Sequence, residues 1–195
     1  MPAAQRREEL IAAAVHEFAR GGIDGTAVER IARRVGVAQP YVFSLFRSKR
    51  ELFIAALERS FERVEDTFRQ AAAAFAEGRA GDCDSVLIAM GRAYRGLLSS
   101  DRDYLMLQHQ SYAACGADEV VRAAVRNRFA HLVELARELS GAEDDRLDDF
   151  FRYGMALQVA AALGVEELSA GSSWVARELR AQAGSTSSRG VRAAG

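Results

Sequence analysis

The sequence predicts an all-α protein, and three observations support that prediction. Only two of the 195 residues are proline, Pro2 and Pro40, so almost every position can donate a backbone hydrogen bond. The strong helix formers Ala, Leu, Arg and Glu dominate the composition. Apolar residues recur at helical spacing along most of the chain, which is typical of amphipathic helices.

The composition favours an ordinary globular protein, with 49% hydrophobic and 27% charged residues. No stretch of eighteen apolar residues occurs, and the N-terminus lacks the apolar core and cleavage site of a secretion signal. We therefore expect a cytoplasmic protein with no membrane partner. The two cysteines and three histidines show no metal-ligand spacing, so we expect no metal ion and no cofactor.

Two helices open the chain. The first is predicted from about residue 4 to residue 20, because Leu10, Ile11, Ala14, Val15 and Phe18 form an apolar stripe before Gly21 and Gly22. In the second, the T-x-x-E pattern of Thr26 and Glu29 predicts a capping box, and Gly36 ends the helix.

A third, short helix begins at Pro40, whose fixed φ suits a first helical turn. The helical wheel places Val42, Phe43 and Phe46 on the inner face. It places Pro40, Tyr41, Ser44 and Leu45 on the outer face. A second capping box, from Ser48 to Glu51, predicts a long helix that reaches about Phe75.

The apolar spacing in the remaining chain predicts five more helices, separated by small polar breaks, at about 84–99, 102–115, 118–140, 144–163 and 173–183. We expect an N-terminal three-helix domain over residues 1–50, which includes the first turn of the connecting helix. A helical body follows over residues 51–183, and residues 184–195 are a disordered tail because they lack periodicity.

Charge divides between these regions. Residues 1–50 hold nine Arg and Lys against five Asp and Glu, a net charge of +4, whereas the whole chain has −1.

Two short helices joined by a glycine-containing turn, the second with an exposed polar face, form a helix-turn-helix, whose second helix enters the DNA major groove. Glutamine can pair with adenine and an apolar ring can pack on a thymine methyl, so Gln39, Pro40 and Tyr41 suit base edges.

The segment GIDGTAVERIARRVGVAQPYVFSLFRSKRELF resembles the N-terminal domain of the TetR (tetracycline repressor) family of bacterial transcription regulators. The matching landmarks are Thr26, Ile31-Ala32, Gly36-Val37, Phe46 and Lys49-x-x-Leu52. The resemblance implies phosphate contacts by Thr26, Tyr41, Arg47 and Lys49, and base reading by Gln39, Pro40, Tyr41 and Ser44. The chain departs from the family at Ala38, where a Ser or Thr usually caps the recognition helix, and at Phe43 and Leu45, which replace the usual aromatic pair.

The resemblance also implies a body that dimerises and binds a small, mostly apolar effector. Candidates for the effector cavity combine adaptable apolar groups with a few polar ones, and they are Met90, Tyr94, Leu97, Met106, Gln110, Tyr112, Phe129 and Leu132. Candidates for the dimer interface are the excess apolar residues of the last two helices: Phe150, Phe151, Tyr153, Met155, Leu157, Val159, Leu163, Trp174, Val175 and Leu179.

The leading hypothesis is therefore a sequence-specific, homodimeric transcription regulator. We expect a repressor that an effector releases from a palindromic operator. The alternative is a helical protein-interaction module with a basic head and no role on DNA. An all-helical enzyme is a third possibility, but no catalytic constellation is visible, so we expect no enzyme.

Overall fold

The computed structural model describes residues 3–164, and this part of the chain is all-α, as predicted, with eight helices and no strand. In order they are α1 (Ala3–Gly25), α2 (Val28–Val35), α3 (Gln39–Leu45), α4 (Lys49–Ala76), α5 (Val86–Ser100), α6 (Arg102–Ala114), α7 (Glu119–Ser140) and α8 (Asp144–Ala162). The helix expected at 173–183 and the tail at 184–195 lie outside the described residues. No described helix is long and apolar enough to cross a membrane.

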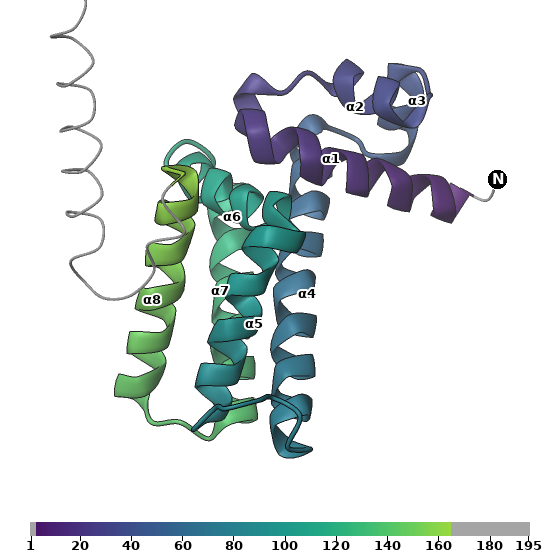
Figure 1. Cartoon of the computed structure of the whole chain (residues 1–195). Helices are drawn as coiled ribbons and strands as arrows, with labels where there is room; N and C mark the ends of the chain where they lie inside the picture. Colours follow the sequence, from purple (N-terminus) through teal and green to yellow (C-terminus); the bar gives the residue numbers. More distant parts are fainter. Residues whose placement is uncertain (1–2, 165–195) are drawn as a thin grey trace, which may run out of the picture.

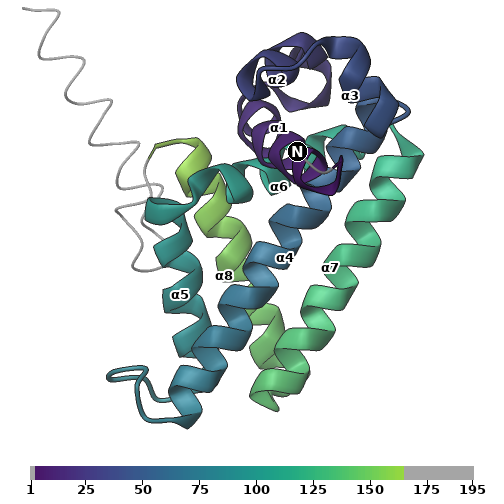
Figure 2. The same ribbon diagram turned by 90° about the vertical axis from the view of Figure 1, so that its right-hand side faces the viewer.

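The first three helices form a head at one end of the molecule (Figure 1). The helix α1 lies across the end of the long helix α4, and α2 and α3 lie beyond α1, away from the other helices (Figure 2). Fully buried aromatic side chains hold the head on α4, because the rings of Phe18 and Phe53 meet edge to face with centroids 5.0 Å apart.

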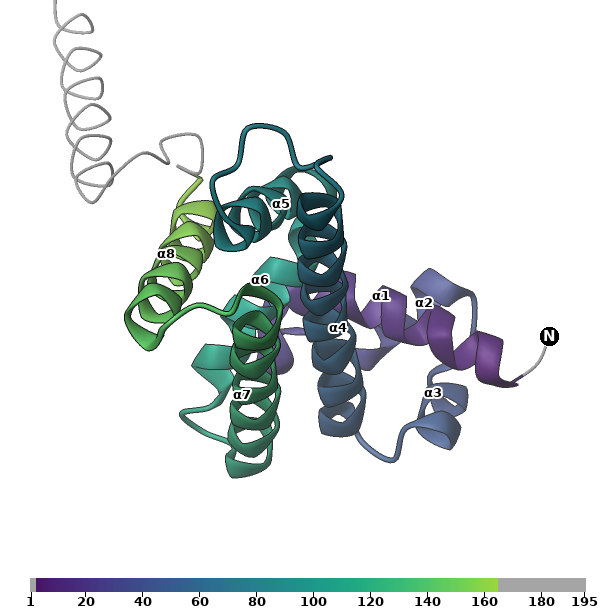
Figure 3. The ribbon, with the colours of Figure 1, turned by 90° about the horizontal axis from the view of Figure 1, so that it is seen from below.

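The helices α4 to α8 form the body, with α8 as the outermost helix (Figure 3). One continuous cluster of buried side chains runs from the head into the body, so the two parts share a core along α4. The predicted boundary between residues 50 and 51 falls in the first turn of α4 and remains a prediction. The described helices from α5 to α8 begin and end within two residues of their predicted bounds.

Two of the predicted helix ends match the structure. Gly36 adopts φ 73° at the C-terminal end of α2, a left-handed conformation that favours glycine. The hydroxyl of Ser48 accepts a hydrogen bond from the backbone N–H of Glu51 at 3.1 Å, which caps α4 as the pattern predicts.

The capping box predicted for α2 is wrong. The residue before α2 is Ala27, which offers no side-chain cap. The hydroxyl of Thr26 instead donates to the backbone carbonyl of Glu17 at 3.1 Å, because the chain after α1 folds back against that helix. The helix α1 also continues beyond the predicted end, to Gly25, with a kink at Gly22 where φ is 61°.

The predicted faces of α3 need a correction. Val42 is buried as expected, but Phe43 is 42% exposed, and Leu45, expected outside, packs against the core. The predicted faces count Phe46 as part of the helix. Phe46 is the C-cap with extended φ and ψ, so the helical face is set by Val42 and Leu45, three residues apart.

Candidate nucleic-acid interface and ligand cavity

Two large rings of α3 are exposed to solvent on different sides of the helix, because they are two residues apart. Tyr41 is 38% exposed and Phe43 is 42% exposed. Pro40 and Ser44 are exposed beside them, and Gln39 is half-buried. The hydroxyl of Ser44 donates to the carbonyl of Tyr41 at 2.7 Å and still has acceptor capacity on its outer side. These side chains are therefore not packed against the described body, which leaves them accessible to a partner.

The opposite side of the head anchors α3 and α2. Phe46 is completely buried, and the guanidinium of Arg7 lies over its ring, 4.9 Å from the centroid. The carboxylate of Glu17, which is 8% exposed, pairs with Arg30 at 2.8 Å and with Arg34 at 3.5 Å. These contacts tie α2 to α1 and fix the direction in which α3 projects.

Basic groups lie at the end of α3 and the start of α4. Arg47 is exposed, and its side chain forms no ion pair within residues 3–164; its backbone N–H donates to Glu51 Oε2 at 3.0 Å. Lys49 Nζ donates to the carbonyl of Asp24 at 3.3 Å, which holds the ammonium beside the turn that precedes α2. Both cations are placed where a polyanion alongside α3 would meet them.

Thr26 does not have the position that we expected. Its side chain is 1% exposed, and its hydroxyl already donates to Glu17 within the head. The structure thus leaves no free hydroxyl for the expected phosphate contact. The residue joins the turn before α2 to α1 instead.

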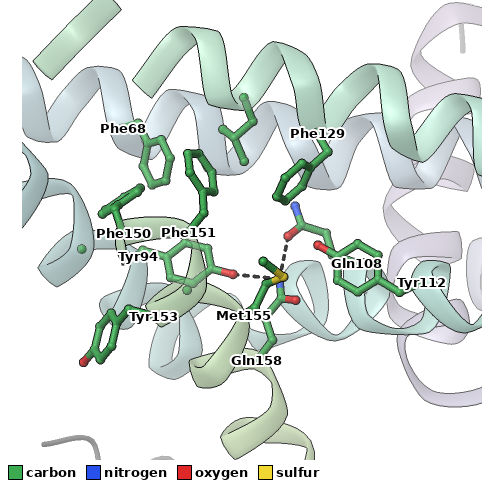
Figure 4. A pocket seen from close by; sticks show the side chains of 13 residues that line it. Phe68, Tyr94, Gln108, Tyr112, Phe129, Phe150, Phe151, Tyr153, Met155 and Gln158 are labelled. Atoms are coloured by element: carbon green, nitrogen blue, oxygen red, sulfur yellow. Dashed lines mark hydrogen bonds between the residues drawn. The ribbon is translucent and has the colours of Figure 1, made fainter. Parts of the chain in front are cut away.

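A second site is a cavity in the body, lined by an unusual density of aromatic rings (Figure 4). The cavity is small, about 30 Å³, and it is partly open at the surface, so a ligand larger than water needs its lining side chains to move apart. Phe68 and Phe150 form one edge-to-face pair, with centroids 5.4 Å apart, and Phe129 and Phe151 lie 5.5 Å apart. The lining is therefore mostly apolar, as in typical small-molecule sites.

A small hydrogen-bonded group interrupts this apolar lining. The amide nitrogen of Gln158 donates to the hydroxyl of Tyr94 at 2.8 Å and to the side-chain oxygen of Gln108 at 2.9 Å. Burial raises the pKa of Tyr94 well above its usual value and raises the pKa of Tyr112 to about 12, an effect that Gln158 partly offsets. Both phenols are therefore protonated at neutral pH.

Four of the eight cavity candidates line this cavity: Tyr94, Tyr112, Phe129 and Leu132. The other four do not. Met90 and Leu97 are buried in the core, and Met106 packs against it. Gln110 lies on the opposite side of α6 from the cavity. The cavity side of α6 is set by Gln108 and Tyr112, four residues apart, so positions two residues away face elsewhere.

The dimer candidates fall into three groups. Phe150, Phe151, Tyr153 and Met155 line the cavity, and Leu157 is only 1% exposed within the chain itself. Met155, Val159 and Leu163 are 45%, 45% and 55% exposed on α8 and at its end. Trp174, Val175 and Leu179 lie outside the described residues.

The sequence reasoning missed Gln108 and Gln158. Gln108 directly follows the apolar run YLML, and Gln158 interrupts the apolar stretch MALQVAAAL. Their burial, with 2% and 3% exposure, is what distinguishes them from surface glutamines. A polar residue on the apolar stripe of a helix is the sequence signal that could have indicated these two buried glutamines.

The head and the cavity meet through α6. Gln110 Oε1 lies against the kink of α1, where a Cβ on Gly22 would meet it at 3.0 Å. Near the other end of α6, Asp103 Oδ2 lies 2.6 Å from Nδ1 of His16 on α1. No group of three His, Cys, Asp or Glu side chains that could hold a metal ion is present among the described residues.

Comparison with known proteins finds a family match for the head. Residues 10–56 match the family model of bacterial regulatory proteins of the tetR family. A curated relative, the HTH-type transcriptional activator FasR of Mycolicibacterium smegmatis, is 35% identical over 71 residues. That match covers 36% of this chain, and it spans about a third, 32%, of the length of FasR.

Solved structures are similar over most of the chain. A transcriptional regulator from Streptomyces coelicolor A3(2) superposes with a TM-score of 0.62 at 18% identity, over 86% of this chain and 99% of that one. A TetR-like regulator from Rhodococcus sp. RHA1 gives 0.57 at 22% identity, over 92% and 98%. The fatty acid degradation regulator FadR from Bacillus halodurans gives 0.58 at 17% identity, over 92% and 89%. At these identities the likeness concerns the fold.

Proposed function

We propose that this chain is a member of the TetR family of bacterial regulatory proteins and a sequence-specific DNA-binding transcription regulator. It acts in the cytoplasm as a homodimer on a palindromic operator. It is a repressor that a small, mostly apolar effector releases from DNA. Residues 1–50 read the operator, and the body that follows binds the effector and dimerises.

The observation that carries this proposal is the exposed surface of α3. Two large rings, Tyr41 and Phe43, stand in solvent on a seven-residue helix that is held by Val42 and Phe46. Exposed apolar groups that gather on a small surface often mark an interaction site. The major groove is wide enough for such a helix, and thymine methyl groups offer the rings an apolar contact.

The charges around this helix agree with a nucleic-acid partner. Arg47 and Lys49 lie at the end of α3, and the N-terminal N–H groups of α4 begin beside them. The helix dipole and these free N–H groups favour an anion at that position. Phosphates on either side of a major groove would therefore meet both the cations and a helix N-terminus.

The position of α6 supports control by an effector. One side of α6 presents Gln108 and Tyr112 to the cavity, and its other side presents Gln110 to the kink of α1. An effector that binds one position of α6 more tightly than another shifts the head with it. In a dimer the two recognition helices then no longer match successive major grooves, which lie about 34 to 36 Å apart.

Operator binding tests the proposal. The full chain is titrated against DNA from its own gene neighbourhood, and protected positions are mapped by footprinting. We expect a protected palindrome and an affinity that falls by about 10³ between about 50 and 200 mM salt, because roughly six phosphate contacts release counterions. A duplex of the same length with one half-site scrambled is the control.

The same titration separates the two leading hypotheses. A protein-interaction module would show no protected palindrome, and its affinity for its partner would change little over that range of salt. The absence of a protected palindrome, or an affinity that does not depend on salt, would overturn the proposal.

The sign of regulation is tested by a reporter downstream of the protected site, in which repression is expected. The similar protein FasR is named an activator. Increased reporter output in the presence of the chain would show activation instead of repression and would leave the proposed DNA binding unchanged.

A further inference from the structure

The cavity holds two buried amide groups whose hydrogen bonding is incomplete. Gln108 and Gln158 are 2% and 3% exposed, and they are joined by one hydrogen bond of 2.9 Å. The remaining amide nitrogen of Gln108 and the side-chain oxygen of Gln158 are buried without a hydrogen-bond partner among the described residues. Buried polar groups are nearly always paired, so these atoms point to a missing partner.

The count of missing partners does not depend on how the two amides are oriented. In the present orientation the Gln158 nitrogen donates to Tyr94 and to Gln108, and one N–H₂ group and one carbonyl oxygen remain. If both amides are rotated by 180°, the Gln158 oxygen accepts from the same two groups, and again one N–H₂ group and one carbonyl oxygen remain. A ligand that completes the network must offer both an acceptor and a donor.

The lining sets the charge of that ligand. Of the described residues that line the cavity, none is Asp, Glu, Lys, Arg or His. The two tyrosines nearest the glutamines, Tyr94 and Tyr112, carry protonated phenols because burial raises their pKa. An ionised group at the glutamine pair would be buried with no opposite charge, which is strongly unfavourable.

We infer that the effector is an uncharged molecule with an aromatic or similarly flat apolar body and a carboxamide-like end, which Gln108 and Gln158 bind as complementary acceptor and donor. The rings of Phe68, Phe129 and Phe150 line the same cavity and would contact the body of such a ligand (Figure 4). This inference rests on the proposed function, because it names the chemistry of the effector that the regulator answers to.

Three small probes of matched shape test the inference: benzamide, benzoate and toluene. Their binding to the full chain is measured by ligand-observed NMR titration, without DNA. We expect benzamide to bind at least about tenfold more tightly than benzoate, which is ionised at neutral pH. Gln108→Leu removes one hydrogen-bond partner, so we expect it to weaken benzamide about tenfold relative to toluene, the equivalent of one hydrogen bond.

Gln70→Leu is the matched control, because Gln70 is exposed on α4 outside the cavity, and it should leave all three affinities unchanged. Thermal unfolding shows whether each variant is folded. If Gln108→Leu does not fold, Gln158→Leu makes the same test, with the same loss of preference for benzamide.

Three outcomes would overturn the inference. Benzoate could bind as tightly as benzamide, which would favour an anionic end in the neighbouring surface groove that Arg92, Arg95 and Arg146 line. The preference for benzamide could survive in both glutamine variants, or benzamide could fail to bind at millimolar concentration. A failed operator footprint together with the expected benzamide preference would instead refute the proposed function and leave the cavity chemistry intact.

Discussion

The ring of Tyr41 is 38% exposed on the helix that we propose enters the major groove. We therefore expect Tyr41→Ala to weaken operator binding by about 1 to 3 kcal/mol, the typical value of a good base contact. The free energy of unfolding should stay within about 0.5 kcal/mol of the unchanged chain, as for an ordinary surface substitution. Fluorescence anisotropy and urea denaturation measure the two quantities. Early unfolding of the variant would show that the ring supports the head rather than DNA.

Phe46 should behave in the opposite way. Its ring is completely buried and is covered by the guanidinium of Arg7. Phe46→Ala leaves a cavity in the head, and we expect it to lower the free energy of unfolding by about 3 to 5 kcal/mol. Urea denaturation followed by circular dichroism measures this. A loss below about 1 kcal/mol would mean that the head does not depend on this ring.

Asp118 makes one part of the stability dependent on pH. The N–H groups of Val121 and Val120 and the guanidinium of Arg50 hold the pKa of its carboxyl below the usual 3.8. A lowered pKa in the folded state means that the carboxylate stabilises the fold at neutral pH, and that this contribution is lost as pH falls through the lowered pKa.

Asp118→Ala should therefore destabilise the chain at neutral pH, and the difference should shrink at pH values below 3.8. Asp118→Asn is the matched control, because asparagine caps a helix about as well as aspartate but does not titrate. Urea denaturation at a series of pH values gives the comparison. A difference between the original chain and Asp118→Ala that is independent of pH would contradict the role of the charge.

At the scale of elements, the kink in α1 decides how the head meets the body. Gly22 has φ 61°, and a Cβ there would lie 3.0 Å from Gln110 Oε1 on α6. We expect Gly22→Ala to destabilise the chain by about 1 to 2 kcal/mol, because the left-handed conformation is strained for alanine. Gly25→Ala, at the end of the same helix, meets no atom within 4 Å and is the control.

Thermal unfolding measures both glycine variants, and operator titration with and without effector measures coupling. Gly22→Ala should also reduce the response to effector, because it disturbs the contact between α1 and α6. If Gly25→Ala has as large an effect as Gly22→Ala, the kink is not the element that joins the head to the body.

The local pattern predicted the elements well where the evidence lay within one helix. The bounds of α4 followed from the Ser48 cap and the long apolar stripe, and Gly36 fixed the end of α2. The pattern failed at Thr26. Its hydroxyl donates a hydrogen bond to the carbonyl of Glu17 on α1 and does not cap the first turn of α2. That choice depends on how the chain folds back, which no local spacing contains.

At the scale of the whole molecule, the outer face of α8 is the surface on which we expect a second copy to dock. Val159 and Leu163 are four residues apart and are about half exposed, and Met155, one turn earlier, is also half exposed at the edge of this surface, where it lines the cavity as well. Val159→Arg should place a charge in that interface and convert the dimer to a monomer, with loss of operator binding. Analytical ultracentrifugation measures the change.

Val120→Arg is the matched control for this variant, because Val120 is 50% exposed on α7. It should leave the dimer intact. A dimer that survives Val159→Arg but not Val120→Arg would place the interface on α7 instead. The same instrument and concentration series serve for both variants.

The sequence by itself determined the helical class, the positions of the described helices apart from the end of α1, and the helix-turn-helix with its basic surroundings. It did so because helical spacing, capping residues and glycine stops act within a few residues of each other. Only the tertiary structure decided which side of each helix packs into the core, lines the cavity or faces solvent. Gln108 and Gln158 are 50 residues apart in sequence and meet because α6 and α8 pack together. The angle and the rotation at which two helices pack depend on side chains from both, so one helix's pattern does not contain them.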